Sequence, residues 1–262
     1  MSQCTACGKP LTLEIDLEGE DESDHDATGS ASEVPDSVEL TCGCYFHWQC
    51  LLDSYEIVQC PQCSKDVSSR NSSGEEQVLC NLNNEGGLQE GFDILPILKE
   101  ESYLRAFPEE RRCRAFLEFC AEGDVGAILD LINSDEDEDT SMSSNEEAAT
   151  KPIDVLRYQD PMGSLSTGLH VAVSNGREEI VWLLLFLASS LELHLFPPDV
   201  LDAARTLGSK REEQTGKVDV RVLEDSNHRT AENLAQQLGG MWEPWIESKR
   251  LRPIVDGILP IV

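Results

Sequence analysis

The chain has little positive charge and no long apolar run. Its 262 residues carry 20 Lys and Arg against 50 Asp and Glu, which gives a formal net charge of -30. A surface this acidic repels nucleic-acid phosphates and anionic lipids, so we expect neither nucleic acid nor a membrane as a partner. The longest apolar run, residues 180–188, has nine residues, whereas about 20 are needed to span a bilayer. The composition therefore predicts a soluble protein.

The first residues lack the features of a secretory signal. Residues 1–10 have neither a positively charged start nor an apolar stretch. Ten cysteines would suit disulfides in a secreted protein. Their C-x-x-C pairing without a signal instead favours metal thiolates in a reducing compartment. We therefore expect a cytoplasmic or nuclear location.

Cysteine and histidine side chains near the N-terminus have the spacing of metal ligands. They form four pairs, and one or two residues separate the members of each pair. A structural zinc site takes four such ligands in a tetrahedron, so eight ligands fill two sites and leave no position for water or substrate. We expect two structural Zn²⁺ ions that build residues 1–67 and perform no chemistry. The eight residues are Cys4, Cys7, Cys42, Cys44, His47, Cys50, Cys60 and Cys63.

Composition divides the rest of the chain into further segments. Residues 14–39, inside the zinc module, carry eleven acids and no Lys or Arg, which predicts a disordered loop. Residues 68–91 begin with a polar, Ser-rich stretch and are interpreted as a linker. Residues 92–250 form a second domain with an acidic insertion at 134–150, and residues 251–262 form an apolar tail.

Apolar periodicity in the second domain predicts pairs of helices joined by tight turns. Residues 113–120 keep the i, i+3, i+4, i+7 spacing of a helix, and a second apolar helix follows the turn at residues 123–124. Residues 164–190 repeat this arrangement around a turn at residues 175–176, and residues 225–240 repeat it more weakly. We therefore expect this domain to be all-α.

The ligand pattern C-x2-C-x34-C-x-C-x2-H-x2-C-x9-C-x2-C resembles that of a RING domain. A PHD finger orders its ligands similarly, but it usually leaves four or five residues between the fourth Cys and the His, where this chain has two. A PHD finger also carries a Trp shortly before the seventh ligand, where this chain has Val58. The RING resemblance implies interleaved sites, in which Cys4, Cys7, His47 and Cys50 hold one zinc and Cys42, Cys44, Cys60 and Cys63 hold the other.

Residues 167–185, TGLHVAVSNGREEIVWLLL, resemble an ankyrin repeat, with Gly168 replacing the usual Pro and loosening the start of the helix. Residues 116–132 and 228–239 resemble parts of the same unit. The family places a structural His at the position of His170, where it hydrogen-bonds between repeats. Because the spacing here is about 54 to 62 residues against the family's 33, three or four divergent repeats are expected and a generic helical bundle is the alternative.

Together these resemblances imply a small zinc-stapled α+β RING module followed by an all-α ankyrin-like repeat domain. They imply a RING-type E3 ubiquitin ligase that positions a ubiquitin-charged conjugating enzyme against an unknown protein substrate held by the repeats. Such a ligase needs no catalytic residue of its own. By the same resemblance Ala6, Tyr55 and Pro61 would contact the conjugating enzyme, although Ala6 replaces a larger apolar residue. The alternative is a non-catalytic, zinc-stabilised interaction scaffold, so whether the protein is an enzyme stays open.

Overall fold

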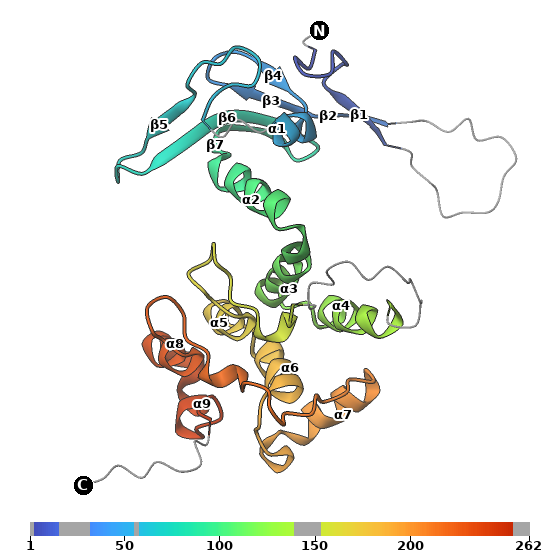
Figure 1. The fold of residues 1–262 in the computed structure, drawn as a ribbon, viewed down its shortest axis with the longest axis vertical. Helices are drawn as coiled ribbons and strands as arrows, with labels where there is room; N and C mark the ends of the chain where they lie inside the picture. Colours follow the sequence, from blue (N-terminus) through green and yellow to red (C-terminus); the bar gives the residue numbers. More distant parts are fainter. Residues whose placement is uncertain (1–2, 16–31, 55–57, 139–152, 254–262) are drawn as a thin grey trace, which may run out of the picture. The chain divides into compact units, whose positions relative to one another are not determined.

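A computed structural model of the chain describes residues 3–15, 32–54, 58–138 and 153–253. The chain forms two compact units, residues 1–106 and 107–262 (Figure 1), and each is described by itself. The elements of the first unit are β1 (Thr12–Ile15), β2 (Ser32–Pro35), β3 (Ser37–Leu40), β4 (Tyr45–Phe46), α1 (Trp48–Ser54), β5 (Ser68–Arg70), β6 (Glu76–Asn84), β7 (Gly87–Asp93) and α2 (Leu95–Ala106).

A curled antiparallel sheet forms the body of the first unit, with β6 as its central strand (Figure 1). Strand β6 pairs with β3, β5 and β7, and β4 extends the sheet beyond β3. Val78, Cys80 and Leu82 alternate along β6 and are all buried, because successive side chains of a strand point to opposite faces. The first unit therefore has one apolar sheet face.

Helices α1 and α2 supply the other side of this core. Leu51 and Leu52 from α1 and Ile94 and Leu98 at α2 are buried in the same cluster as the β6 side chains. The carboxylate of Asp93 accepts from the backbone amides of Val78 (2.9 Å) and Leu95 (3.1 Å), so it ties the start of α2 to the sheet. Helix α2 is therefore part of the first unit.

The predicted fold class is wrong. The protein is a mixed α/β fold with a curled antiparallel sheet and helices, and not a small RING module followed by an all-α repeat domain. The residues interpreted as a linker, 68–91, form β5, β6 and most of β7. Helix α2, which was assigned to the second domain, lies in the first unit. Val78, Cys80 and Leu82 alternate with polar residues, which is the pattern of a half-buried strand, but the Ser-rich stretch before β6 favours a linker by composition.

The residues expected to form a disordered acidic loop are partly ordered. Residues 32–35 of that segment form β2 and residues 37–39 lie in β3, and β2 pairs with β1 antiparallel. Val38 and Leu40 alternate on the buried face of β3, so two apolar residues specify a strand within an acidic stretch. Residues 16–31 lie outside the described part of the chain.

The second unit is built from helices around α6. Its elements are the short 3₁₀ turns η1 (Pro108–Glu110), η2 (Val155–Arg157), η3 (Leu193–Leu195), η4 (Val220–Val222) and η5 (Gly240–Trp242), and the helices α3 (Arg111–Glu122), α4 (Val125–Glu138), α5 (Gly168–Ser174), α6 (Glu178–Ala188), α7 (Pro198–Thr206), α8 (Ala231–Leu238) and α9 (Glu243–Glu247).

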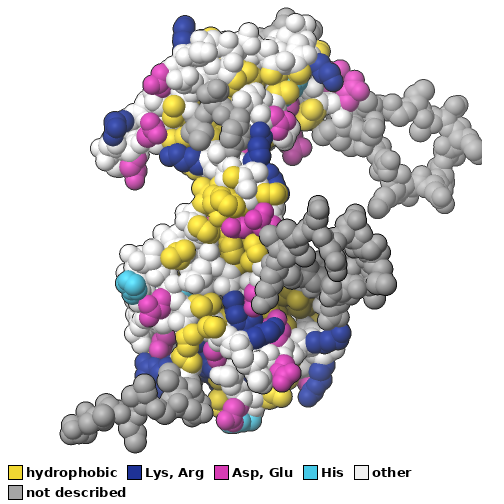
Figure 2. All heavy atoms as spheres, in the orientation of Figure 1, with side chains coloured by type: hydrophobic (Ala, Val, Ile, Leu, Met, Phe, Trp, Pro, Cys, Tyr) yellow, Lys and Arg dark blue, Asp and Glu magenta, His cyan; other side chains and the backbone are white. Residues whose placement is uncertain are grey.

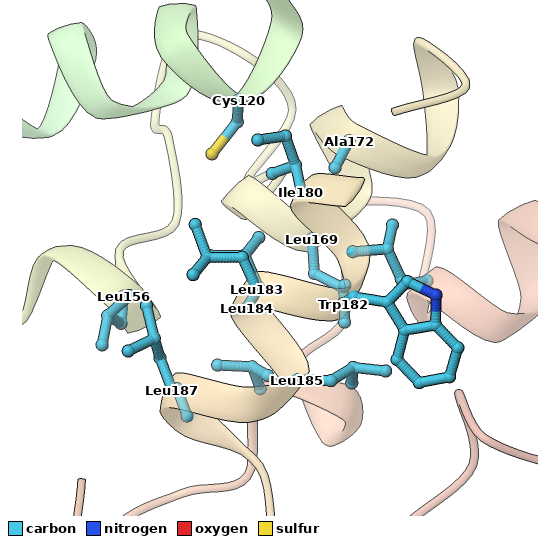
Figure 3. Packing of buried hydrophobic residues seen from close by; sticks show 14 of the residues in the cluster. Cys120, Leu156, Leu169, Ala172, Ile180, Trp182, Leu183, Leu184, Leu185 and Leu187 are labelled. Atoms are coloured by element: carbon cyan, nitrogen blue, oxygen red, sulfur yellow. The ribbon is translucent and has the colours of Figure 1, made fainter. Parts of the chain in front are cut away.

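Helix α6 is buried on almost every side. Its residues Ile180–Leu185 are all buried, as are Leu187 and Ala188. Figure 3 shows these side chains projecting in several directions, with Cys120 of α3 and Leu156 of η2 nearby. A helix that is apolar all round belongs in the interior of a domain. The run of nine apolar residues therefore forms the centre of this unit.

Local signals define the helix pairs that the periodicity predicted. The α3–α4 turn uses Gly123 at φ +87°, whose amide donates to the Phe119 carbonyl at 2.9 Å. Helix α5 begins with a capping box between Thr167 and His170, and Nε2 of His170 lies 2.8 Å from the carbonyl of Arg229. His170 therefore bridges two segments that are 59 residues apart, in a structural role.

Two predicted segments fall wholly or partly outside the described residues. Helix α4 extends to Glu138, so the acidic insertion at 134–150 begins within a helix, and residues 139–152 are not described. The apolar tail is described only as far as residue 253. In the described part of the chain no helix has the length and apolar character needed to cross a membrane. Figure 2 shows acidic, basic and apolar side chains interspersed on the face that it displays.

Replacing Gly168 with Ala is expected to destabilise the second unit. A Cβ atom at this position would lie 2.6 Å from Cε1 of Phe116 and 3.1 Å from Sγ of Cys120. Glycine therefore permits the close approach of α5 to α3, and does not merely loosen the start of α5. We expect the free energy of unfolding to fall by about 1–3 kcal/mol, the usual cost of overpacking. Urea unfolding followed by circular dichroism measures it.

The matched control for this change is Gly126→Ala in α4. A Cβ atom there would meet only Oδ1 of Asp124, at 3.4 Å. Alanine favours a helix over glycine by about 0.5–1 kcal/mol, so this variant should be at least as stable as the unmodified protein. Equal stability of both variants would contradict the close α3–α5 packing.

Candidate metal centre

The structure brings one set of four predicted ligands together from two distant parts of the chain. Cys4 and Cys7 lie in a turn before β1, His47 directly precedes α1, and Cys50 lies within α1. Their ligand atoms all lie within 4.8 Å of one another. Nδ1 of His47 is 3.3 Å from Sγ of Cys7 and 3.8 Å from Sγ of Cys50. In a tetrahedral zinc site with ordinary bond lengths, a nitrogen ligand and a sulfur ligand lie about 3.6 Å apart.

A hydrogen bond on the far side of the ring orients His47. Its Nε2 lies 2.7 Å from the carbonyl oxygen of Pro10, which can only accept, so Nε2 carries the proton and donates. Nδ1 is then left with its lone pair facing the cysteine sulfurs. Metal-bound histidines are oriented in this way by a second hydrogen bond. The carbonyl of Pro10 is a functional group that the sequence did not indicate.

The second set of four ligands is built from a tight turn and a second C-x-x-C segment. Cys42 and Cys44 follow β3 in a turn where the Leu40 amide donates to the Cys44 carbonyl at 3.0 Å and Gly43 adopts φ +83°. Cys60 and Cys63 lie before β5. The four sulfurs lie within 4.8 Å of one another. All four ligands of this group are therefore cysteines.

The two C-x-x-C segments are internal repeats. Residues 3–10 read QCTACGKP and residues 59–66 read QCPQCSKD. In each, the amide of the first Cys donates to the Lys carbonyl (2.9 Å for both), and the residue after the second Cys donates to the first Cys carbonyl (2.8 Å for both). Gly8 and Ser64 occupy the equivalent left-handed position, at φ +72° and +55°. The backbone of each segment therefore forms the same turn.

The crowded thiols of each group resist joint ionisation. Burial together with the thiolates of Cys7 and Cys4 raises the pKa of Cys50 to about 12. Burial and the neighbouring Cys60, Cys42 and Cys63 likewise raise the pKa of Cys44 to about 12.

Backbone amides oppose this effect, and the Lys65 amide is the main cause that lowers the pKa of Cys63 to about 7. A bound cation would offset the repulsion among the thiolates. Each group could therefore hold a metal ion.

Comparisons of this chain with known protein families, with curated proteins and with solved structures find no match. The metal groups are the feature from which a function can be proposed.

The cysteines outside the two groups are buried in the cores. Burial raises the pKa of Cys80 and Cys113 to about 11 and that of Cys120 to about 12. Cys80 packs in the first unit, and Cys113 and Cys120 pack in the second. They behave as small apolar side chains.

The residues expected to contact a conjugating enzyme are placed in part. Ala6 is exposed on the first C-x-x-C turn, and Pro61 is half-buried on the second. Tyr55 lies outside the described residues. Leu51 and Leu52 retain 2% and 7% of their surface and face the core, so they offer no apolar surface to a partner.

Proposed function

We propose that each group binds a structural Zn²⁺ ion and that the first unit, held by these ions, docks a ubiquitin-charged conjugating enzyme. The protein would then act as a ubiquitin ligase. The pairing of the ligands is the observation that supports the proposal. In chain order, the first ligand pair groups with the third and the second ligand pair groups with the fourth, which is the interleaved order that the RING resemblance implies.

The donor set favours zinc over other metals. Seven thiols and one imidazole make up the two groups, and soft sulfur ligands in a tetrahedral arrangement suit Zn²⁺. Four protein ligands per ion would leave no open coordination position. Bound zinc would cross-link distant segments of the chain and would compensate the negative charge of the thiolates. It would not activate water.

The residues of the chain would act by binding and orienting. The two C-x-x-C turns would be held at fixed positions by their metals, with Ala6 and Pro61 on their outer surfaces. Holding a reactive thioester in a productive pose accelerates transfer without a nucleophile from the ligase. No residue is therefore assigned a catalytic role.

A non-catalytic scaffold is the second candidate. The small side chain of Ala6 and the burial of Leu51 and Leu52 favour it, because they leave little apolar surface for a conjugating enzyme. In that case the metal-bound unit would bind a protein partner without transferring ubiquitin.

Autoubiquitination assays on the full-length, zinc-loaded protein separate the two candidates. We expect ubiquitin chains with at least one member of a panel of conjugating enzymes. Ala6→Asp should abolish them, since a charge replaces the apolar contact, while leaving two zinc ions bound. Ala6→Ile should raise the rate several-fold, because the apolar side chain grows by the equivalent of about three methylene groups.

Gln236→Asp serves as the control, since Gln236 is exposed on α8 in the other unit. It should leave the rate unchanged. If no conjugating enzyme of the panel yields ubiquitin chains while both zinc ions are bound, the ligase proposal is rejected and the scaffold is favoured.

A further inference from the structure

The second unit contains an apolar groove of about 780 Å³ between α4, α6 and α7. This volume lies within the range of ligand-binding clefts. Its lining includes Trp182, Leu183 and Phe186 from α6, and Val200 and Leu207 at α7. Leu207 is 49% exposed, although it is a large apolar residue. The groove therefore offers apolar surface that the chain's described residues leave in contact with water.

The charges around the groove favour a basic ligand. Glu178, Glu179 and Asp199 lie on its rim, and all three are exposed. None of them forms an ion pair among the described residues. Arg250 also lines the groove, with its guanidinium 5.0 Å from the ring centre of Trp182, so three carboxylates and one cation leave the lining net negative.

We propose that the groove binds an amphipathic helix of a partner protein whose apolar face is flanked by Lys or Arg. Helix-lined grooves take the i, i+3/i+4 and i+7 side chains of such a helix. The rim carboxylates would pair with its basic residues. This proposal stands independently of any ligase activity in the first unit.

Binding of a labelled peptide to the full chain tests the proposal. The probe is the 18-residue helical peptide KLLKLLKKLLKLLKKLLK, and its counterpart with Glu in place of every Lys is the reference. We expect the Lys peptide to bind at least tenfold more tightly than the Glu peptide at low salt, and the difference to shrink at high salt. Leu207→Asp should weaken Lys-peptide binding about tenfold, because it places a charge in the apolar lining.

Rim charges are tested against charges elsewhere on the same unit. Glu179→Lys with Asp199→Lys should weaken Lys-peptide binding about tenfold. Glu213→Lys with Glu243→Lys changes the net charge equally at exposed positions outside the groove, and should change the affinity less than threefold. Equal losses in both double variants would overturn the proposal, because they would reflect only the overall negative field.

One further measurement keeps the proposal falsifiable. Sedimentation analysis should show a monomer. A dimer that Leu207→Asp dissociates, with no peptide binding by the unmodified protein, would overturn the proposal and assign the groove to a second copy of the chain.

Discussion

Removing the metal, or replacing Cys60 and Cys63 with Ser, is expected to unfold the sheet of the first unit while leaving the second unit folded. Cys4 and Cys60 are each 1% exposed and belong to the same buried cluster as the β3 and β6 side chains. Without a cation, the crowded thiols lose the charge compensation that holds them together. Metal binding contributes about 10 kcal/mol or more to the folding of small zinc modules.

Hydrogen exchange with mass spectrometry measures this effect separately in the two units. In the Cys60→Ser, Cys63→Ser variant, amides of β3 and β6 should lose protection, whereas amides of α6 should keep it. The metal content should fall from two ions per chain to one or fewer. Cys113→Ala, which alters a buried cysteine of the second unit, should keep both ions. Unchanged protection of β6 after complete chelation would show that the sheet does not depend on metal.

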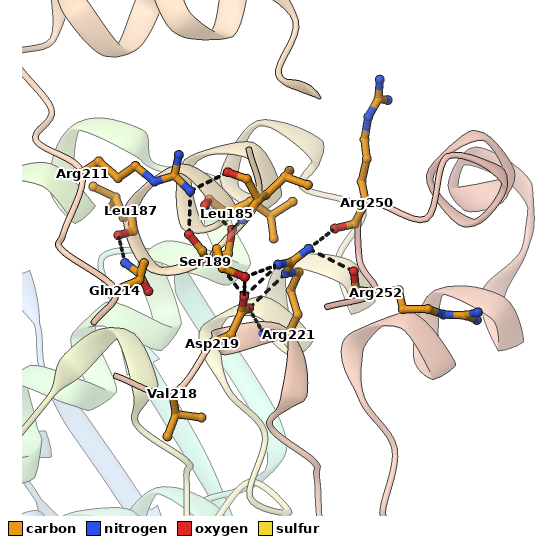
Figure 4. Close-up of polar contacts among 12 residues, drawn as sticks. Leu185, Leu187, Ser189, Arg211, Gln214, Val218, Asp219, Arg221, Arg250 and Arg252 are labelled. Carbon is orange, nitrogen blue, oxygen red and sulfur yellow. Dashed lines mark hydrogen bonds and ion pairs between the residues drawn. The ribbon is translucent and has the colours of Figure 1, made fainter. Parts of the chain in front are cut away.

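Replacing Arg221 with Met is expected to destabilise the second unit by about 3–5 kcal/mol, which is the cost of removing one partner of a buried ion pair. Arg221 is 2% exposed, and its guanidinium donates to Asp219 at 2.7 and 3.0 Å (Figure 4). It also donates to Oγ of Ser190 (2.9 Å) and to the carbonyls of Arg250 (3.3 Å) and Arg252 (3.0 Å). Methionine fills similar volume but leaves the Asp219 carboxylate buried without its cation. Urea unfolding measures the loss.

The pH dependence of stability provides a second signature of this ion pair. Burial raises the pKa of Asp219, but hydrogen bonds from Arg221 and Ser190 outweigh it and lower the pKa from 3.8 to about 2. Because the pKa is lower in the folded state, the carboxylate stabilises the unit above about pH 4, and this is lost as the pH falls towards 2. The contribution is about 2 kcal/mol. In Arg221→Met this component of the acid sensitivity should shrink, because only the hydrogen bonds from Ser190 and the backbone still lower the pKa of Asp219.

An exposed ion pair provides the control for the Arg221 variant. Arg205 and Asp202 lie 2.8 Å apart on α7, and their side chains are 76% and 71% exposed. Arg205→Met should cost less than about 1 kcal/mol, because water screens such a pair. Similar losses of unfolding free energy in the two variants would mean that the Arg221 network stabilises the unit no more than an exposed ion pair does.

The sequence by itself determined which cysteines and histidine form the two metal groups and where α3 to α6 lie. Ligand spacing is informative because one C-x-x-C turn must place both sulfurs on a single small ion. Periodicity is informative for α3 and α6 because their apolar residues pack against neighbouring helices. Both signals are local, since they depend on residues within one or two turns of the chain.

Only the tertiary structure decided the sheet, the groove and the Arg221 network. Strand β6 carries the alternation of a half-buried strand, but its pairing with β3 joins residues about 40 positions apart, which local spacing does not specify. The groove needs side chains from α4, α6 and α7. Arg221 forms hydrogen bonds with residues that precede it and residues that follow it in the chain. Such features arise from long-range packing, which residue types and their local spacing do not specify.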